Sequence, residues 1–526
     1  MRYRAVFYSL GRLLQMLSGV LLIPLGISLW DHHASGWFSS SESTSFLFTI
    51  GLSLVLGTLL QVGFRSGRHE QGVKEGFAVV GLGWIVLTLL GSLPFLDLFL
   101  RSGQAFLPAF TDAYFETMSG FSTTGATILS DVEALPRGLL FWRSLTHWLG
   151  GMGIITLVLA IFPAMGVAGY QMFRGEVPGP SADRLRPRLA ATAGILWGVY
   201  LLLTVLETIL LAAGGMSLFD SLCHSFGTMA TGGFSTRNAS IGAYGSAYIE
   251  WVVIVFMFLA GVNFLLHYRM IFRRDWRSLR ENREFHFYLG TVVLAVLFVT
   301  LLLFLGGLPE AGDTFQHYRP DPGSPAYHSA HVAAEGGKVE AFGDAFRAAS
   351  FQVLAILTTT GYGTADFDVW PRAIGILFVI LMFWGGCAGS TGGGMKMIRV
   401  MVTFKAAWRE VKKVVRPRLI APLKVRRSTI EEPMVANIVG FFVLFVGLFV
   451  ICSFLMSFFI PDLTTAVSSV VATIANIGPG LAGVGSTQTY GWIPVPGKWV
   501  LILCMLLGRL EIFTVLVLFR PSFWRS

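Results

Sequence analysis

Long apolar stretches, separated by short polar or basic ones, run along the whole chain. They lie near residues 14–30, 45–63, 77–100, 138–163, 189–213, 248–271, 286–307, 372–384, 434–460 and 497–519. Most reach the ~20 residues that an α-helix needs to cross a bilayer. Apolar and polar residues do not sustain the period of two that a membrane barrel requires. The pattern therefore predicts an all-α polytopic membrane protein.

A shorter unit recurs within this pattern: a half-length amphipathic segment followed by a small glycine motif. The half-length segments cover Leu107–Phe121, Leu218–Met229, Ala341–Leu357 and Thr464–Ala475. The motifs after them are Thr123-Thr124-Gly125, Ala230-Thr231-Gly232, Thr359-Thr360-Gly361 and Asn476-Ile477-Gly478. Each half-length segment is too short to span, and such a re-entrant helix is tolerated only where the following non-helical backbone lines a watery cavity.

The glycine motifs have the character of an ion filter. The third, Thr359 to Gly363, differs by one residue from TVGYG, whose backbone carbonyls replace the hydration shell of potassium. Carbonyls converge on one ion only if the backbone adopts unusual torsions with no side chain in the way, which glycine permits. A half-helix that points its C-terminal end inward adds about half a negative charge. Four such motifs in one chain would complete a ring, and they predict a cation pore.

Glycine in a membrane helix has a second ordinary explanation, which is close packing between helices. The chain contains 60 glycines, so packing is the default explanation for any one of them. The four motifs differ, because polar Thr, Ser or Asn residues flank each one at membrane depth and each follows a half-length segment. We therefore expect the filter at these motifs.

Composition agrees with a lipid environment. Hydrophobic residues make up 54% of the chain, charged residues only 13%, and the mean hydropathy is +0.66. A soluble protein carries about 25% charged residues. The cysteines lie in apolar stretches without paired spacing, so we expect buried small hydrophobes rather than a disulfide or zinc framework.

The net charge of +9 is unevenly distributed along the chain. Basic residues gather in Arg2–Arg12, Arg65–Lys74, Arg174–Arg188, Arg269–Arg283 and Lys396–Arg427. If the apolar stretches span, these segments share one side, and the positive-inside rule places that side and both termini in the cytoplasm. The opposite side is more acidic, which raises the local cation concentration. Because the basic residues lie in short loops next to the membrane, we expect lipid as their partner and no nucleic acid.

The recurring unit predicts four helix–pore-loop–helix repeats around a central pore, preceded by an N-terminal helix pair. The expected limits are 1–70 for the pair and 71–172, 173–284, 285–428 and 429–526 for the four repeats. An outer loop, 308–340, interrupts the third repeat and carries His317, His328 and His331. Without a cysteine or a HExxH-like spacing, these histidines indicate a solvated loop rather than a metal site.

Further motifs follow the glycine segments. They are Trp142–Thr146 and Trp148–Gly153, Gly261–Phe264 with His267-Tyr268, Gly386–Gly394, and Gly508–Glu511 in the last helix. With these motifs the chain resembles the TrkH/TrkG branch of the Trk/Ktr/HKT superfamily of potassium transporters over essentially its whole length. The N-terminal helix pair looks like the extra domain that TrkH-type proteins have and KtrB-type proteins lack.

The resemblance implies potassium uptake across the inner membrane of a bacterium, with K⁺ as the transported ion and no enzymatic activity. It also implies a homodimer in which each protomer has its own pore. A cytosolic ring of the TrkA type would bind the regulatory nucleotide, so none is expected on this chain itself. The coupling ion, if any, and the nucleotide are not specified by the sequence.

The motifs depart from a symmetric potassium channel. Only the third has the full Thr-x-Gly-Tyr-Gly form, whereas the fourth continues into Pro479 and the second into Phe234. Fewer aligned carbonyl layers can then be built. We expect a short filter with moderate discrimination of potassium over sodium, and we expect rubidium to be accepted.

A glycine-rich run, residues 385–396, interrupts the helix that starts near Ala373. It is not a phosphate-binding loop, because Met395 and Lys396 follow Gly394 where a P-loop has Gly-Lys-Ser/Thr. A kinked, tightly packed helix is one interpretation. The family resemblance favours a flexible intramembrane loop that closes the pore. The gating residues are then Gly389, Ser390, Thr391, Gly392, Gly393, Gly394 and, in the last helix, Arg509.

Arg509 is predicted near the middle of the last spanning helix. An arginine there costs ~2.5–3.5 kcal/mol on insertion, so it must face protein or water. One interpretation is a structural ion pair with Glu207 or Glu511, although a local pair with Glu511 is difficult two positions away on a helix. The other is a fixed positive charge below the filter that limits ion flow.

Three alternatives to a passive pore remain. A membrane potential of 100 mV is worth ~2.3 kcal/mol per charge, enough to drive uptake through a gated pore. Symport with protons or sodium stays open, with Glu116 and Asp112 as modest candidates for proton transfer. A carrier for an organic solute would show inverted two-fold repeats. A membrane enzyme would need a metal-binding helix or an activated Ser/His/Asp set, and the sequence contains neither.

Overall fold

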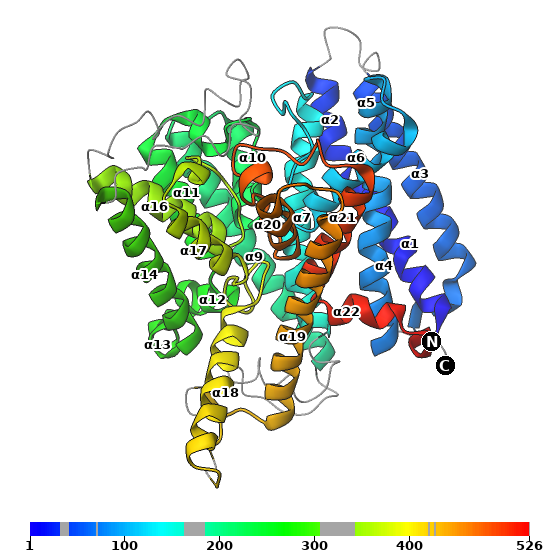
Figure 1. Ribbon diagram of the computed structural model, residues 1–526. Coiled ribbons are helices and arrows are strands. Elements are labelled where there is room, and N and C mark those ends of the chain that lie inside the picture. Colours follow the sequence, from blue (N-terminus) through cyan, green and yellow to red (C-terminus); the bar gives the residue numbers. More distant parts are fainter. Residues whose placement is uncertain are drawn as a thin grey trace.

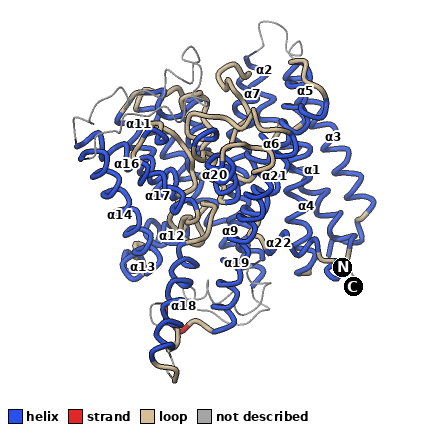
Figure 2. Tube along the Cα trace, in the orientation of Figure 1, coloured by secondary structure: helices blue, strands red, loops and turns tan. Residues whose placement is uncertain are grey.

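The computed structural model describes residues 1–31, 41–69, 72–161, 185–305, 342–418, 421–425 and 428–524. The regular secondary structure of this part is helical except for one antiparallel pair of two-residue strands, β1 (Lys424–Val425) and β2 (Ser428–Thr429) (Figures 1 and 2). Within it, six helical segments are long and apolar enough to cross a membrane, and eight are if two bent pairs count as spans. The predicted all-α polytopic membrane fold is confirmed.

Four repeats of helix, half-helix and helix build the molecule. The first contains α4 (Val73–Gly91), α5 (Leu93–Arg101), α6 (Phe106–Phe121) and α7 (Arg137–Ile161). The second contains α9 (Leu185–Ala213), α10 (Leu218–Met229), α11 (Ala247–Ala260), α12 (Phe264–Arg273) and α13 (Trp276–Glu281). The third contains α14 (Arg283–Leu305), α16 (Phe342–Leu357), α17 (Arg372–Met382) and α18 (Met397–Val415). The fourth contains α19 (Glu432–Met456), α20 (Leu463–Ile474), α21 (Val495–Arg509), α22 (Phe513–Leu516) and α23 (Pro521–Trp524).

The half-helices α6, α10, α16 and α20 agree with the predicted half-length segments to within one residue at either end. Side-chain caps fix the start of two of them. Ser217 accepts a hydrogen bond from the backbone N–H of Asp220, and Asp462 accepts one from Thr465, which satisfies N–H groups that the first helical turn leaves free. The four half-helices lie in the upper half of the molecule in Figure 1, with the connecting loops beside them.

The N-terminal helices α1 (Tyr3–Val20), α2 (Leu22–Asp31) and α3 (Ser41–Gly63) pack beside the first repeat. Helices α1 and α3 cross at glycines: a Cβ added to Gly11 would lie 2.7 Å from the carbonyl oxygen of Gly57. Small residues allow such close approach in a membrane, where helix association depends on packing. The Tyr3 hydroxyl donates to the carbonyl of Trp524 at 2.9 Å, so both ends of the chain lie together (Figure 1).

Two predicted spans are broken. The apolar stretch near 248–271 forms α11 and α12, bent by 102°. The stretch near 497–519 forms α21, then α22 and the short helix η7 (Val517–Phe519), with a bend of 111°. The prediction that Arg509 stands near the middle of a continuous helix is therefore wrong. Arg509 is the last residue of α21, and the break follows it because Glu511 and Ile512 have positive φ of 55° and 20°.

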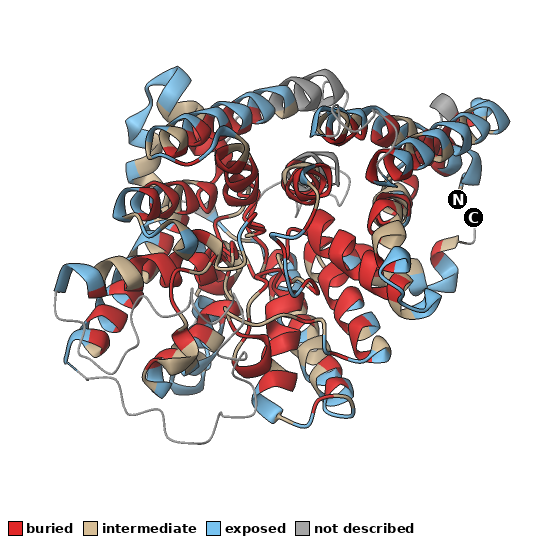
Figure 3. Ribbon diagram, turned by 90° about the horizontal axis from the view of Figure 1, so that it is seen from above, coloured by how far each residue is buried: buried red, intermediate tan, exposed pale blue. Residues whose placement is uncertain are grey.

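The buried core follows the central axis of the molecule. Viewed from above, buried residues fill the middle and exposed ones form the periphery (Figure 3). Every residue from Thr111 to Phe121 in α6 is buried, and so is every residue from Cys223 to Met229 in α10. The half-helices thus point their C-terminal ends into protein. The predicted outer loop 308–340, with its histidines, lies outside the described residues.

Candidate functional site

The four glycine motifs share one backbone conformation. In each, a non-glycine residue with positive φ is followed two positions later by a glycine with positive φ. The first set consists of Thr123, Thr231, Thr359 and Asn476, with φ between 51° and 61°. The second set, the glycine layer, consists of Gly125, Gly233, Gly361 and Gly478, with φ between 75° and 100°. Segments more than a hundred residues apart in sequence therefore form the same turn.

Each motif folds its N–H groups back onto its own half-helix. The N–H of Thr124 donates to the carbonyl of Ser119 at 2.9 Å, and that of Thr123 to Gly120 at 2.9 Å. Equivalent bonds occur at Gly232, Thr360 and Ile477, with lengths of 2.8, 2.9 and 2.8 Å. This arrangement, with a left-handed residue just past the helix end, is a Schellman motif. The N–H groups of the motif are therefore hydrogen-bonded to the half-helix, and the carbonyl oxygens of the motif remain available.

Three of the left-handed residues are threonines, and a β-branched residue rarely adopts a positive φ. Holding one there costs on the order of 1–3 kcal/mol and requires the surroundings to impose it. Thr123, Thr231 and Thr359 are all 0% exposed. The motifs are therefore held in shape by packing on every side.

The four motifs close into a ring. A Cβ added to Gly125 would lie 2.0 Å from the carbonyl oxygen of Gly232 in the second motif. A Cβ added to Gly233 would lie 1.9 Å from the carbonyl oxygen of Thr360, and one added to Gly361 would lie 1.9 Å from that of Ile477. A Cβ added to Gly478 would lie 2.7 Å from the carbonyl oxygen of Thr124, in the first motif, so the fourth motif contacts the first. Each glycine faces the carbonyl of the next segment, so any side chain there would collide with the ring.

The second motif differs by one residue from its predicted register. Ala230 is the residue that caps α10, the position that Ser122 occupies after α6. The equivalent of Gly125 is Gly233, because Gly233 has φ of 79° whereas Gly232 does not have positive φ. Thr231, Gly232 and Gly233 therefore correspond to Thr123, Thr124 and Gly125. The sequence offers two adjacent glycines here and contains no signal that distinguishes them.

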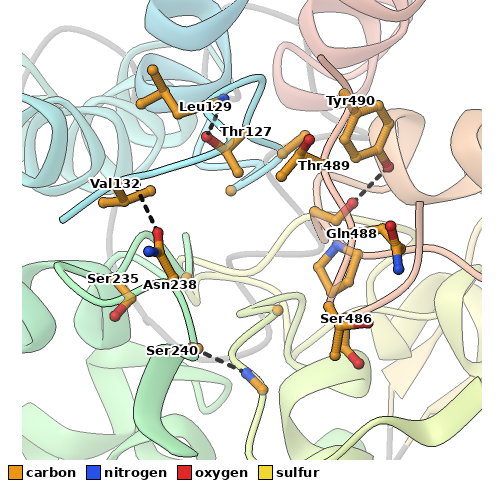
Figure 4. Close-up of a pocket in the computed structure, with 18 of the residues that line it drawn as sticks. Thr127, Leu129, Val132, Ser235, Asn238, Ser240, Ser486, Gln488, Thr489 and Tyr490 are labelled. Atoms are coloured by element: carbon orange, nitrogen blue, oxygen red, sulfur yellow. Dashed lines mark hydrogen bonds between the residues drawn. The ribbon is translucent and has the colours of Figure 1, made fainter. Parts of the chain in front are cut away.

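A pocket of about 100 Å³ lies against one end of the ring (Figure 4). All four members of the glycine layer line it, together with residues that follow each motif, including Thr127, Ser235, Gly363 and Tyr490. Among the described residues, its charged lining consists of Arg143 and Arg237, with no carboxylate. The rest of the pocket surface combines hydroxyls, amides and backbone with apolar side chains such as Leu129 and Val132.

A buried ion pair supports the first two motifs beside this pocket. The Nε of Arg143 donates to Glu116 at 2.6 Å, and both side chains are at most 4% exposed. Glu116 also accepts from the backbone N–H of Ile128 at 3.0 Å, while Arg143 donates to the carbonyl of Ser235 at 2.8 Å. The Arg143 guanidinium lies 3.5 Å from the centre of the Phe234 ring, a cation–π contact. Glu116, a modest candidate for proton transfer, is thus engaged in joining segments.

Further polar contacts join the other repeats. Lys498 of α21 donates to Asp112 of α6 at 2.6 Å, so the second proton-transfer candidate is also paired. Arg347 of α16 donates to Glu250 of α11 at 2.9 Å. Between the third and fourth repeats, Asp368 accepts from the backbone N–H of Ala482 at 3.1 Å. Burial, and then the neighbouring Asp366, raise the pKa of Asp368 to about 8.

The glycine-rich run lies against the opposite end of the ring from the pocket. It forms an irregular loop between α17 and α18, hereafter the intramembrane loop. The N–H of Gly393 donates to the Thr359 hydroxyl at 2.6 Å, and a Cβ on Gly393 would lie 2.3 Å from the carbonyl oxygen of Ala475. The Thr391 hydroxyl donates to the carbonyl of Met229 at 2.9 Å. The loop therefore touches the half-helix ends of the second, third and fourth repeats.

Arg509 binds this loop to the first repeat. It donates to the carbonyl of Thr391 at 2.8 Å and to that of Gly150 in α7 at 2.9 Å. Arg509 is 2% exposed. Neither predicted ion pair is formed: Glu511 is paired with Arg399, and Glu207 is not an Arg509 partner. The arginine charge is instead solvated by backbone carbonyls.

Sequence reasoning named the four motifs, the loop and Arg509, but it missed Gly233, Tyr490 and Asp368 and assigned no role to Arg143. Arg143 lies in the Trp142–Thr146 motif, which could have marked it. Tyr490 and Asp368 have no local signal, because they act on backbone that is distant in sequence.

Comparisons with known proteins give a consistent result. Residues 42–526 match the family model TrkH, described as a cation transport protein. The chain is 37% identical over 527 residues to the Trk system potassium uptake protein TrkH of Escherichia coli strain K12, with 100% of each chain covered. It is 30% identical over 524 residues to TrkG of the same strain, covering 99% of each. The crystal structure of the potassium transporter TrkH from Vibrio parahaemolyticus matches with a TM-score of 0.84 and 35% identity over 100% of both chains.

Proposed function

Because the chain belongs to the TrkH family of cation transport proteins, we propose that it takes up potassium through a gated, channel-like pore. It is a membrane transport protein of the Trk type and not an enzyme, and the resemblance expected from its sequence is confirmed. K⁺ is the transported ion, and the membrane is the inner membrane of a bacterium.

The observation that carries the proposal is the closure of four glycine motifs into one ring. Each glycine lies against a carbonyl oxygen of the next segment, and N–H groups of the motifs donate hydrogen bonds to the half-helices. Among the described residues, no hydrogen bond reaches the carbonyl oxygens of Thr124, Gly232, Thr360 or Ile477. Buried carbonyls without partners are costly unless another ligand replaces water, and a dehydrated alkali ion is such a ligand.

In this proposal the ions pass from the pocket through the ring to the intramembrane loop. The filter consists of Thr123–Gly125, Thr231–Gly233, Thr359–Gly361 and Asn476–Gly478. It is short, distinguishes potassium from sodium moderately and accepts rubidium. The loop, held by Arg509, blocks the inner end of the ring at rest. A variant lacking Gly389–Gly394 would then conduct more than the wild type.

Assembly and orientation belong to the same proposal. Both termini and the basic α18–α19 connection face the cytoplasm, in agreement with the positive-inside rule. There a nucleotide-binding ring of the TrkA type regulates the loop, and two copies of this chain form a dimer with one pore each. In this proposal the repeats have the limits expected from the sequence, 71–172, 173–284, 285–428 and 429–526, except that the third begins with α14 at Arg283.

The test is ion flux in vesicles that contain the purified chain. A passive pore moves potassium only down its electrochemical gradient. With the membrane potential clamped so that this gradient stays at zero, an imposed proton or sodium gradient would leave potassium content unchanged. Net accumulation under those conditions would contradict the passive pore and favour symport. Absence of any potassium flux from correctly folded protein, with the regulatory partner present, would overturn the function itself.

One observation favours the symport alternative enough to include it in this test. Glu207 of α9 is 0% exposed, and in the described part of the chain neither carboxyl oxygen has a hydrogen-bond partner. An ionisable side chain inside a membrane protein marks a functional site by default. If Glu207 carries a coupled proton, Glu207→Gln would abolish proton-driven accumulation while potassium-driven flux persists. If the pore is passive, Glu207→Gln would leave both measurements as in the wild type.

A further inference from the structure

The fourth motif departs from the other three within the glycine layer. Gly478 has φ of 100°, whereas Gly125, Gly233 and Gly361 have φ of 78°, 79° and 75°. The contact between the fourth motif and the first is also wider than the other three contacts between neighbouring motifs. The Cβ-to-carbonyl distance from Gly478 to Thr124 is 2.7 Å, against 1.9–2.0 Å at the other three contacts. The ring is therefore regular over three segments and displaced at the join between the fourth and the first.

A tyrosine hydroxyl lies at this join. The hydroxyl of Tyr490 donates to the carbonyl oxygen of Gly478 at 2.7 Å, a short and well-formed bond (Figure 4). In the described part of the chain, the carbonyl oxygens of Gly125, Gly233 and Gly361 accept no hydrogen bond. Gly478 is thus the member of the glycine layer whose carbonyl is already engaged by protein.

The position of Tyr490 is fixed from several directions. Its backbone N–H donates to the carbonyl of Thr127, just beyond the first motif, at 2.8 Å. Its ring packs against Phe115 of α6 with a centroid distance of 5.7 Å, and the residue is 2% exposed. Tyr490 therefore belongs to the fourth repeat by sequence and is anchored on the first repeat. A hydroxyl held in this way directs the Gly478 carbonyl rather than following it.

We infer that Tyr490 is a specificity-determining residue, whose hydroxyl withdraws the Gly478 carbonyl from the glycine layer and leaves three free carbonyls for the ion. This rests on the proposed function, since it concerns how the same ring selects its ion. The preference of a carbonyl site for potassium depends on the number and field strength of its carbonyls. A layer with three free carbonyls and one engaged carbonyl distinguishes potassium from sodium less sharply than a layer of four.

The test is Tyr490→Phe, which removes the hydroxyl and keeps the ring against Phe115. Potassium and sodium flux are measured in the same vesicles as for the wild type. The released Gly478 carbonyl can join the layer, so the potassium-to-sodium flux ratio should rise at least threefold and the half-saturating potassium concentration should fall. The matched control is Tyr114→Phe, which removes the hydroxyl of a 6% exposed tyrosine whose partner is the carbonyl of Ile85, outside the ring.

A binding measurement on folded protein accompanies the flux. Thermal unfolding of the detergent-solubilised chain is followed in potassium and in sodium, and the stabilisation by potassium relative to sodium should be larger in Tyr490→Phe than in the wild type. An unchanged or smaller ratio in either measurement would overturn the inference, and so would a variant that does not fold. Wild-type potassium flux in the same vesicles is the check on the function itself, so the two failures are distinguishable.

Discussion

The glycine ring and the intramembrane loop are both irregular, glycine-rich segments at membrane depth, yet they satisfy their backbone in opposite ways. The ring turns its N–H groups onto the half-helices, and, apart from the Gly478 carbonyl that Tyr490 engages, its carbonyls accept no hydrogen bond within the described part of the chain. The loop binds neighbours with its polar groups, including the half-helix ends, α7 through Arg509, and the Thr359 hydroxyl. The ring is rigid because many left-handed residues are packed into place. The loop is held by separate hydrogen bonds to neighbouring elements, including backbone bonds from Cys387 to the carbonyl of Gly261 and from Phe264 to the carbonyl of Gly389.

This difference indicates which of the two segments can change its conformation. Moving the ring would require several strained, buried residues to rearrange together, so it can serve as a permanent binding site. Releasing the loop requires a set of separate backbone and side-chain hydrogen bonds to break, each worth about 1 kcal/mol or somewhat more when charged. A partner that supplies several kcal/mol of differential binding could therefore shift the loop without disturbing the ring.

The largest effect should come from a side chain placed in the ring. In Gly361→Ala the new Cβ would lie 1.9 Å from the carbonyl oxygen of Ile477, at a φ of 75° that L-residues disfavour by roughly 1–2 kcal/mol. We expect potassium flux to fall by a factor of ten or more. The control in the same motif is Gly363→Ala, where the nearest atom is 3.7 Å away. Equal flux in the two variants would contradict the rigid ring.

A smaller effect of opposite sign should follow when the loop loses its arginine. Arg509→Gln removes donors to the carbonyls of Thr391 and Gly150. A charge-assisted bond worth about 1.5 kcal/mol corresponds to roughly a tenfold change in the closed-to-open ratio. We expect flux to rise three- to tenfold in single-channel or vesicle recordings. Arg520→Gln, at an exposed arginine, is the control. Loss of folding instead would assign Arg509 a structural role.

A still smaller gain in flux should follow from one hydroxyl of the loop. Thr391→Val keeps the side-chain shape but removes the donor to the carbonyl of Met229, at a cost of about 1 kcal/mol to the closed state. We expect flux to rise about two- to fivefold, less than for Arg509→Gln. Thr403→Val is a matched control, because the buried Thr403 hydroxyl has no hydrogen-bond partner among the described residues. A larger rise in Thr403→Val than in Thr391→Val would argue against the loop as the barrier.

The last prediction concerns stability and its pH dependence, with no change in flux, where Asp368 of the third repeat contacts Ala482 of the fourth. Burial, with Asp366 adding to it, raises the pKa of Asp368 from 3.8 to about 8. Between these values the folded chain keeps a proton that the unfolded chain has released, so stability falls as pH rises. The slope is at most about 1.4 kcal/mol per pH unit and disappears above about pH 8.

Thermal unfolding from pH 5 to 9 checks this prediction. The melting temperature of the wild type should fall relative to that of Asp368→Asn up to about pH 8. Above that pH the two curves should run parallel. In Asp366→Asn the point at which they become parallel should move to lower pH, because one of the causes of the raised pKa is removed. Parallel curves at every pH would show that Asp368 does not hold a proton in the folded state.

The fold and the half-helices could be predicted from the sequence because their signals are local. Apolar length marks a span, and a half-length segment before a glycine marks a re-entrant helix, so α10 has the predicted bounds Leu218–Met229. Breaks in the spans were less accessible. Nothing between Arg509 and Phe513 is a glycine or proline, and the bend there follows from the positive φ of Glu511 and Ile512, which the surrounding packing imposes.

The candidate site was predictable only as far as the motifs themselves. The register at Gly232-Gly233 is decided by which glycine faces Thr360 of the next segment, a contact across more than a hundred residues. The partners of Arg509 are backbone carbonyls, which have no sequence identity to search for. Tyr490 acts twelve residues from Gly478 through a hydroxyl bond that no periodicity encodes. Long-range contacts of this kind need coordinates.

That a single polypeptide supplies all four sides of the ring has a consequence for inheritance. In an assembly of identical subunits, one codon change alters every side at once. In this chain a single codon change alters one motif of the four, so each motif can evolve independently and mild variants can accumulate. The fourth motif, with its Gly478–Tyr490 hydrogen bond and its different φ at Gly478, is an example of a motif that has diverged from the other three.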